Sequence, residues 1–300
     1  MKRILILSTA IAALVVGTST ALAATPVPFP STMADQLFVG AQTVTTGGVM
    51  TNYYAPGDTV VFRAYAVITK SKKIVTSQEA KYFYVAIPNQ PNVKMKYDPT
   101  AAGATSKMPW VGTWTIPSDY ATGSVKFNLR VKLKGRQIGG FMQTPVAPSL
   151  LTVSATPPTL FAPAPSNADN GPGGTSGKID LSLYVDSVNG SSPVGVGKRQ
   201  VGCSQTNVYR IGEQVVFRVW GMDLTSGAVL SNDNVDSATV SIAGQPDVKL
   251  GFGAHGTYQF WAAPWIVPTT MPIGTTVAHV TFTTVDGKTG TFDYALNIIP

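Results

Sequence analysis

The sequence has little of the chemistry on which catalysis usually depends. It holds 1 cysteine and 2 histidines, and only 12% of its residues are charged. No Ser/His/Asp arrangement, HExxH motif, paired-cysteine spacing or haem-attachment motif is visible. A cupredoxin copper site needs two histidines and a cysteine, and no such spacing surrounds Cys203. We therefore expect a non-enzymatic protein with no catalytic residues, no metal and no cofactor.

The single cysteine also excludes a disulfide within the chain, so apolar packing must hold the fold together. Two interpretations of Cys203 stay open: a small buried side chain, or an exposed thiol that pairs between chains. His279 falls on the outward parity of its strand and His255 lies in a glycine-rich loop, which favours the surface for both.

The N-terminus has the pattern of an export signal. Basic residues at positions 2 and 3 precede an apolar run over 4–16, and a small-x-small motif ends at Ala23. The run is shorter than the roughly 20 residues of a membrane-spanning helix. We therefore predict a signal peptide over 1–23, cleaved after Ala23, and a periplasmic or secreted mature protein that meets the membrane only through that peptide.

The chain contains one sequence twice. The motif TNxYxxGxxVVFR begins at Thr51 and again at Thr206, and the motif WxxxWxxP begins at Trp110 and again at Trp261. The spacing between the repeats shortens by four residues in a loop before Trp110, where a change of length is tolerated. We call residues 25–153 the first copy and residues 179–300 the second copy of a duplicated domain.

The segment over 154–178, between the two copies, is rich in proline and glycine. Such a composition buries too little apolar surface to become ordered by itself. We predict a linker here and expect the two domains to be loosely coupled.

Within each copy, apolar and polar residues alternate. Leu129 and Val131 alternate with Arg130 and Lys132, as in a strand with one face in the core and one in water. The strands expected in the first copy lie near 35–46, 58–68, 80–87, 92–97, 110–116, 123–133 and 138–153. Short strands at this spacing, without a helical period, predict an all-β sandwich fold.

A tryptophan-bearing strand at Trp114 is followed by a Pro/Gly corner that contains Pro117, Tyr120 and Gly123. A second strand comes next and ends near Gly135. This succession of strand, corner and strand resembles the late strands of bacterial immunoglobulin-like and fibronectin-III-like modules. The resemblance covers both copies and implies an all-β chain of two immunoglobulin-like β-sandwich domains joined by the Pro/Gly-rich linker. It implies no single activity, because such folds carry many different sites.

Charge separates the two copies. Residues 25–153 hold 13 Lys and Arg against 5 Asp and Glu, whereas residues 175–300 hold 7 against 9. Basic residues of the first copy share the outward parity of two strands that we expect in one sheet. The candidate anionic-partner face consists of Lys94, Lys96, Lys126, Arg130, Lys132 and Lys134. It either attracts an anionic partner or is a solvated face whose charges block edge pairing.

Four tryptophans occur as two pairs, each pair four residues apart, so the two rings of a pair lie on one face of a strand. The pairs are Trp110 with Trp114 and Trp261 with Trp265. Each pair is either an exposed aromatic platform for a sugar ring or part of the core between the sheets, and the core is the favoured interpretation.

The leading hypothesis is a non-catalytic binding or scaffold protein of the cell envelope, with its basic first copy facing an anionic partner. The partner is expected to be an envelope or extracellular protein or polysaccharide, preferably acidic, and not a nucleic acid. Two alternatives are a carbohydrate-binding accessory protein that uses the paired tryptophans and a periplasmic assembly chaperone that offers a strand edge.

Overall fold

The computed structural model describes residues 27–28, 37–100, 107–135, 138–142, 150–157, 171–172, 179–190, 203–256 and 258–300. Within these ranges the chain is all-β and has no helix, which confirms the predicted fold class. No helix in these ranges is therefore long and apolar enough to span a membrane. The predicted signal peptide, its cleavage site at Ala23 and most of the predicted linker lie outside the described residues.

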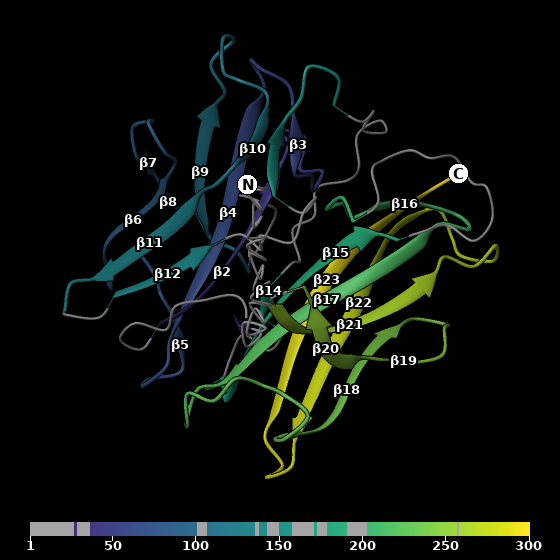
Figure 1. Ribbon diagram of the computed structural model, residues 1–300. Coiled ribbons are helices and arrows are strands. Elements are labelled where there is room, and N and C mark those ends of the chain that lie inside the picture. The colour runs from purple at the N-terminus through teal and green to yellow at the C-terminus, as the bar shows by residue number, and fades with distance from the viewer. Residues whose placement is uncertain are drawn as a thin grey trace, which may run out of the picture.

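In the first copy, the described strands form two main sheets and one short sheet, drawn in purple to teal in Figure 1. The first sheet, of order β2-β4-β9-β8 with β5 beside β4, contains β2 (Leu37–Val44), β4 (Thr59–Ile68), β5 (Lys73–Ile74), β8 (Lys96–Tyr97) and β9 (Trp110–Thr115). The second, of order β12-β11-β6-β7, contains β6 (Ala80–Ala86), β7 (Val93–Lys94), β11 (Asn128–Leu133) and β12 (Ile138–Met142). The short sheet, of order β10-β13-β3, contains β3 (Tyr53–Tyr54), β10 (Gly123–Val125) and β13 (Leu151–Val153).

The described strands of the second copy, together with two short strands from outside it, form two larger sheets. The first, of order β1-β21-β17-β15 with β20 beside β21, contains β1 (Val27–Pro28), β15 (Leu181–Asn189), β17 (Gln214–Asp223), β20 (Gly251–His255) and β21 (Tyr258–Ile266). The second, of order β14-β23-β22-β18-β19 with β16 beside β23, contains β14 (Gly171–Pro172), β16 (Val208–Arg210), β18 (Val235–Ile242), β19 (Val248–Lys249), β22 (Gly274–Thr284) and β23 (Thr289–Ile299).

The two main sheets of each copy face each other as the layers of a sandwich. In the first copy, the rings of Phe83 on β6 and Trp110 on β9 lie 5.1 Å apart between the sheets. In the second copy, Trp261 on β21 and Phe282 on β22 lie 5.3 Å apart in the same way. The alternation read from the sequence therefore places its apolar side chains between the layers.

The two copies are packed against each other. Strand β2 is buried along its whole length and β15 along all but its last residue, because each lies between its own core and the other copy. The hydroxyl of Tyr65 donates to Leu183 O across the contact, and the rings of Phe141 and Tyr184 lie 5.4 Å apart. One continuous cluster of buried apolar side chains runs through both copies. The expectation of loose coupling is therefore wrong.

Hydrogen bonds cross this contact in a reciprocal pattern. Gln205 N donates to Asn52 Oδ1 at 2.7 Å, and Met50 N donates to Asn207 Oδ1 at 3.1 Å. Thr51 forms an isolated antiparallel bridge with its own counterpart, Thr206. Asn52 and Asn207 are also counterparts in the repeat. Each copy therefore accepts from the other the same kind of hydrogen bond that it donates.

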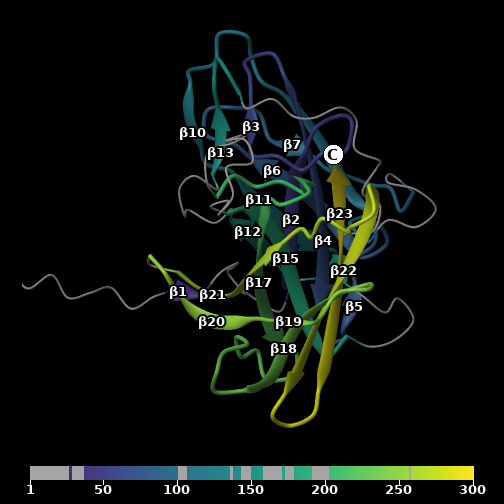
Figure 2. The same cartoon turned by 90° about the vertical axis from the view of Figure 1, so that its right-hand side faces the viewer.

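Two short strands from outside the main body of the second copy pair with its sheets. Strand β1 pairs in parallel with β21, Val27 opposite Tyr258 (Figure 2). Strand β14, within the predicted linker, pairs with β23, Gly171 opposite Asp293. Residues 27–28 fall in the first copy by sequence but join a sheet of the second, which ties the copies together further.

Candidate functional site

The outer face of the β12-β11-β6-β7 sheet holds three of the predicted basic residues. On β11, Leu129 and Val131 are buried while Arg130 is exposed, as the alternation predicted. Arg130 is paired with Tyr84 on β6, and Tyr84 is paired with Lys94 on β7. Because directly opposed residues of neighbouring strands share a face, these three side chains form one row across the sheet.

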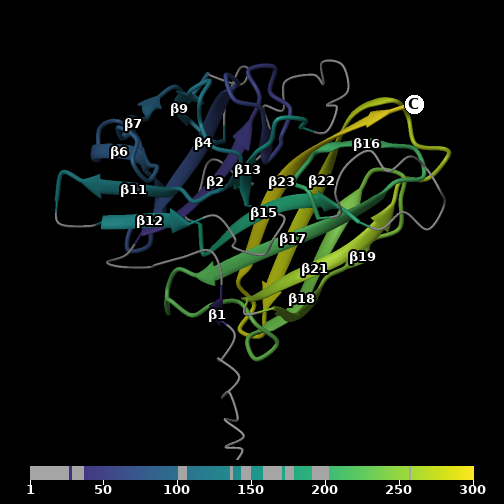
Figure 3. The same ribbon diagram turned by 45° about the horizontal axis from the view of Figure 1, so that its top comes forward.

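A second row lies two residues further along the strands. Lys132 is paired with Tyr82 on one side and with Ile138 on the other. Tyr82 is 40% exposed and Ile138 is 39% exposed, and the rings of Tyr82 and Tyr84 lie 5.3 Å apart. We call the two rows the basic-aromatic face: Lys94, Tyr84 and Arg130, then Tyr82, Lys132 and Ile138. Figure 3 shows its strands on the side of the first copy away from β18, β19 and β21.

The tyrosines of this face were not singled out from the sequence. Tyr82 and Tyr84 alternate with Phe83 and Val85, which are buried. This is the same two-residue period that identified the outward residues of β11. Applied to β6, it would have placed both rings on the outward face of their strand.

The other three basic candidates lie outside the two rows. Lys96 belongs to β8 and pairs with the opposite sheet, so the prediction that Lys94 and Lys96 share a sheet is wrong. The physical reason is that the chain crosses between the sheets at Met95, whose side chain is buried. Lys126 and Lys134 are exposed just before and just after β11, where they extend the basic-aromatic face at its ends.

The equivalent face of the second copy has different chemistry on the same backbone. Thr239 is paired with Lys249 on one side and Thr281 on the other. By the repeat, Thr239 stands where the first copy has Tyr84, and Thr281 stands where it has Arg130. Only the lysine of this row is retained, so the second copy presents hydroxyls in place of the ring and the guanidinium.

The paired tryptophans belong to the core. Three are almost fully buried and one is half-buried: Trp110 (5% exposed), Trp114 (7%), Trp261 (5%) and Trp265. The indole Nε1 of Trp110 donates to Val75 O and that of Trp261 to Leu230 O, each at 2.9 Å. This corrects the platform hypothesis, because a sugar ring cannot stack on faces already covered by the opposite sheet.

The described residues hold no group of three or more His, Cys, Asp or Glu side chains that could bind a metal. His279 is exposed. His255 stacks on Phe260 with ring centroids 4.2 Å apart, and partial burial together with the charge of Arg218 lowers the pKa of its imidazole. Of the two interpretations of Cys203, the structure has the exposed thiol.

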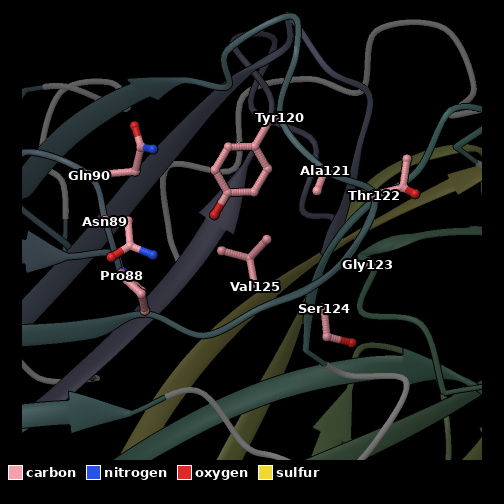
Figure 4. Close-up of a pocket in the computed structure, with 9 residues that line it drawn as sticks. All are labelled: Pro88, Asn89, Gln90, Tyr120, Ala121, Thr122, Gly123, Ser124 and Val125. Carbon is pink, nitrogen blue, oxygen red and sulfur yellow. The ribbon is translucent and has the colours of Figure 1, made fainter.

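A pocket of about 350 Å³ opens at one end of the first copy, between residues 88–90 and residues 120–125 (Figure 4). Figure 4 shows the Tyr120 ring between these two segments, with Asn89 and Gln90 on one side of it. The ring is held edge-on against Trp114, with centroids 5.4 Å apart and an interplanar angle of 79°. The volume lies within the usual range for small-ligand sites, roughly 300–1,000 Å³.

Comparison with known proteins gives little information about the function of this chain. No family model and no curated protein matches the chain. Among solved structures, it is similar to SGBP-B of the Bacteroides ovatus mixed-linkage glucan utilization locus, in complex with a mixed-linkage heptasaccharide, at 9% identity and a TM-score of 0.18. The match covers 87% of this chain and 61% of that chain. A TM-score of 0.18 does not define a shared fold, so function is argued below from this chain's own surfaces.

Proposed function

We propose that the chain is an exported, non-catalytic binding protein of the cell envelope, built from tandem immunoglobulin-like modules. Its first copy holds an anionic polysaccharide on the basic-aromatic face. The observation that carries the proposal is the difference between the copies: a row of Lys94, Tyr84 and Arg130 in one, and of Lys249, Thr239 and Thr281 in the other.

Charge supports an anionic partner. The first copy carries 13 basic against 5 acidic residues, so its field attracts polyanions and speeds their arrival. On the face itself, Arg130 and Lys94 are exposed, and their charges are free to pair with carboxylates or sulfates of a ligand.

The tyrosines favour a polysaccharide over an acidic protein. Tyr82 and Tyr84 present ring surface in line with the cations, and an aromatic ring is apolar on its face and polar at its hydroxyl. A chain of sugar rings has both apolar ring faces and polar edges at short intervals, so it matches a sheet surface in which rings and cations alternate.

The test is the affinity of the mature chain for polygalacturonate, measured by isothermal titration calorimetry. Lys94→Glu is compared with Lys249→Glu, which changes the net charge equally at the equivalent position of the second copy. The double variant Arg130→Glu/Lys132→Glu should raise the Kd by roughly tenfold or more, and raising NaCl from about 50 mM to about 500 mM should weaken wild-type binding.

Lys94→Glu should lower the affinity severalfold and Lys249→Glu should leave it close to wild type. If charge reversal on the basic-aromatic face left the affinity unchanged, or if Lys249→Glu weakened binding as much as Lys94→Glu, the proposed function would be overturned.

A further inference from the structure

We infer that the pocket between residues 88–90 and 120–125 is a sugar subsite, which takes the uncharged, hydroxyl-bearing edge of one ring of the polysaccharide. The inference rests on the proposed function, because the same polymer would have to reach both the basic-aromatic face and the pocket.

The position of the pocket links it to that face. Val125 lines the pocket, and the exposed Lys126 follows it directly. From there the outward residues of the chain are Asn128, Arg130 and Lys132, one every second position. At about 3.3 Å per residue, the β11 part of this line, from Lys132 to Asn128, is about 13 Å long. Residues 126–127 then connect β11 to β10, whose residues line the pocket.

The chemistry of the walls suits the hydroxyl edge of a sugar ring. None of the nine described residues that line the pocket carries a charge. Asn89 and Gln90 supply amides that both donate and accept, and Ser124 supplies a hydroxyl that does the same. Sugar hydroxyls also act in both senses. Tyr120 adds an aromatic ring, which gives the apolar side of a pyranose a surface to contact.

The walls are fixed before any ligand arrives. Gln90 N donates to Ile87 O at 3.1 Å, which closes the turn that carries Asn89. Tyr120 N donates to Pro117 O at 3.0 Å, and Trp114 supports its ring. A site held by its own turns loses little conformational entropy on binding, which favours affinity.

The second copy shows which of these side chains the fold itself requires. Its turn is closed in the same way, by Gln245 N donating to Ile242 O at 2.9 Å, but it has Gly244 where the first copy has Asn89. Both residues have positive φ, 73° for Gly244 and 60° for Asn89. Glycine adopts this conformation without steric cost, whereas asparagine only tolerates it.

The opposite wall differs as well. The second copy has the buried Met271 in place of Tyr120, although its backbone makes the same bond, Met271 N to Pro268 O at 3.0 Å. The backbone of the pocket thus forms without a ring or an extra amide. The backbone therefore does not require Asn89 and Tyr120, which occur in the copy that also has the cations, and binding a ligand would account for both.

The double variant Asn89→Gly/Tyr120→Met tests the inference, because it installs the residues that the second copy carries on the same backbone. Gln90→Ala is a milder variant, and Gln245→Ala is its matched control in the second copy. Circular dichroism and thermal unfolding check that each variant is folded. The probes are polygalacturonate, which has charge and sugar rings, and polyglutamate, which has charge alone.

The double variant should bind polygalacturonate about three- to tenfold more weakly than wild type and polyglutamate equally well. Gln90→Ala should show a smaller loss for polygalacturonate, and Gln245→Ala none. Wild-type affinity of the pocket variants for polygalacturonate, or an equal loss for both probes, would overturn the sugar subsite. Failure of the proposed function gives a different result: Arg130→Glu/Lys132→Glu then binds as wild type, or wild type itself binds no polygalacturonate.

Discussion

The first and second copies carry the same side chains at the reciprocal contact between them and different ones on their outer sheets. Asn52 and Asn207 make the same bond to the opposite copy, and Thr51 and Thr206 pair with each other. On the outer sheets, in contrast, Arg130 has become Thr281 or the reverse. The comparison shows that the reciprocal contact keeps its side chains in both copies, whereas the outer sheets differ in their chemistry.

Buried positions differ between the copies as well, and one of them changes the charge of the core. In the second copy, Arg218 forms two bonds with Asp186, from Nε to Oδ1 at 2.6 Å and from Nη2 to Oδ2 at 2.7 Å. In the first copy, the equivalent Arg63 lies opposite Gln42. Burial lowers the pKa of Arg63, whereas at Arg218 the carboxylate outweighs burial and raises the pKa of the guanidinium. One sandwich therefore encloses an ion pair and the other encloses a cation beside an amide.

The largest effect is expected from breaking that ion pair. Asp186→Ala leaves the Arg218 charge buried without its carboxylate, and we expect a loss of about 3–5 kcal/mol in the free energy of unfolding. Gln42→Ala, the matched change in the first copy, removes a neutral partner and should cost about 1–3 kcal/mol. Urea unfolding measures both. Equal losses would mean that the two buried sites are energetically alike, contrary to the comparison.

The next largest effect is expected from breaking the reciprocal contact between the copies. Asn52→Ala and Asn207→Ala each leave a buried backbone N–H of the other copy without its acceptor, at a cost of about 1–3 kcal/mol. Because the two sites flank one bridge, the losses in the double variant should not add. Asn128→Ala on the outer sheet is the control, with a change within about 0.5 kcal/mol.

Wild type should unfold in one transition, since one core spans both copies. Two separate transitions in calorimetry, with each asparagine variant shifting only one of them, would contradict the packed arrangement.

The smallest effect concerns acid stability, in which the second copy differs from the first. Burial raises the pKa of Asp223, but hydrogen bonds from Lys288 Nζ, Thr225 N and Ser226 Oγ outweigh it and lower the pKa to about 2. The folded-state pKa lies below the unfolded value of about 3.9, so this carboxylate stabilises the fold above about pH 4, and the contribution is lost as the pH falls towards 2.

Lys288→Met should raise the pKa of Asp223 and reduce the free energy of unfolding at pH 6 by less than the asparagine variants do, with little difference from wild type at pH 2. The first copy has Ile68 at the equivalent position and lacks this dependence. Unfolding free energies of wild type and variant between pH 6 and pH 2 test this, and a loss of the same size at every pH would show that the lysine acts by packing alone.

Strand positions were largely predictable from the sequence, because alternation is a local property. The range predicted near 58–68 contains β4 (Thr59–Ile68), and the one near 110–116 contains β9 (Trp110–Thr115). The spacing of Trp110 and Trp114 also predicted a shared face. Which face it is depends on the opposite sheet, so only the structure decided between core and platform.

The packing of the copies was not predictable in the same way. The Pro/Gly-rich composition of residues 154–178 describes only that segment and says nothing about the surfaces it connects. The strands that indicate this packing are β2 and β15, which are buried on both faces. Burial on both faces is more usual for strands of a central layer than for strands with one face in water. Lys94 and Lys96 were misassigned for a related reason: parity assumes one straight strand, and the chain changes sheets at Met95.

The reciprocal contact of Asn52 and Asn207 around Thr51 and Thr206 has the form of an isologous interface, in which one patch meets a second copy of itself. A single-domain homodimer with this interface would have a true dyad axis and two identical outer surfaces. Joining the subunits in one polypeptide keeps the dyad at the contact and removes the requirement for identity elsewhere. The two ends of this molecule can therefore differ, with one basic and the other rich in hydroxyls, while the contact around Thr51 and Thr206 retains the symmetry of a dimer.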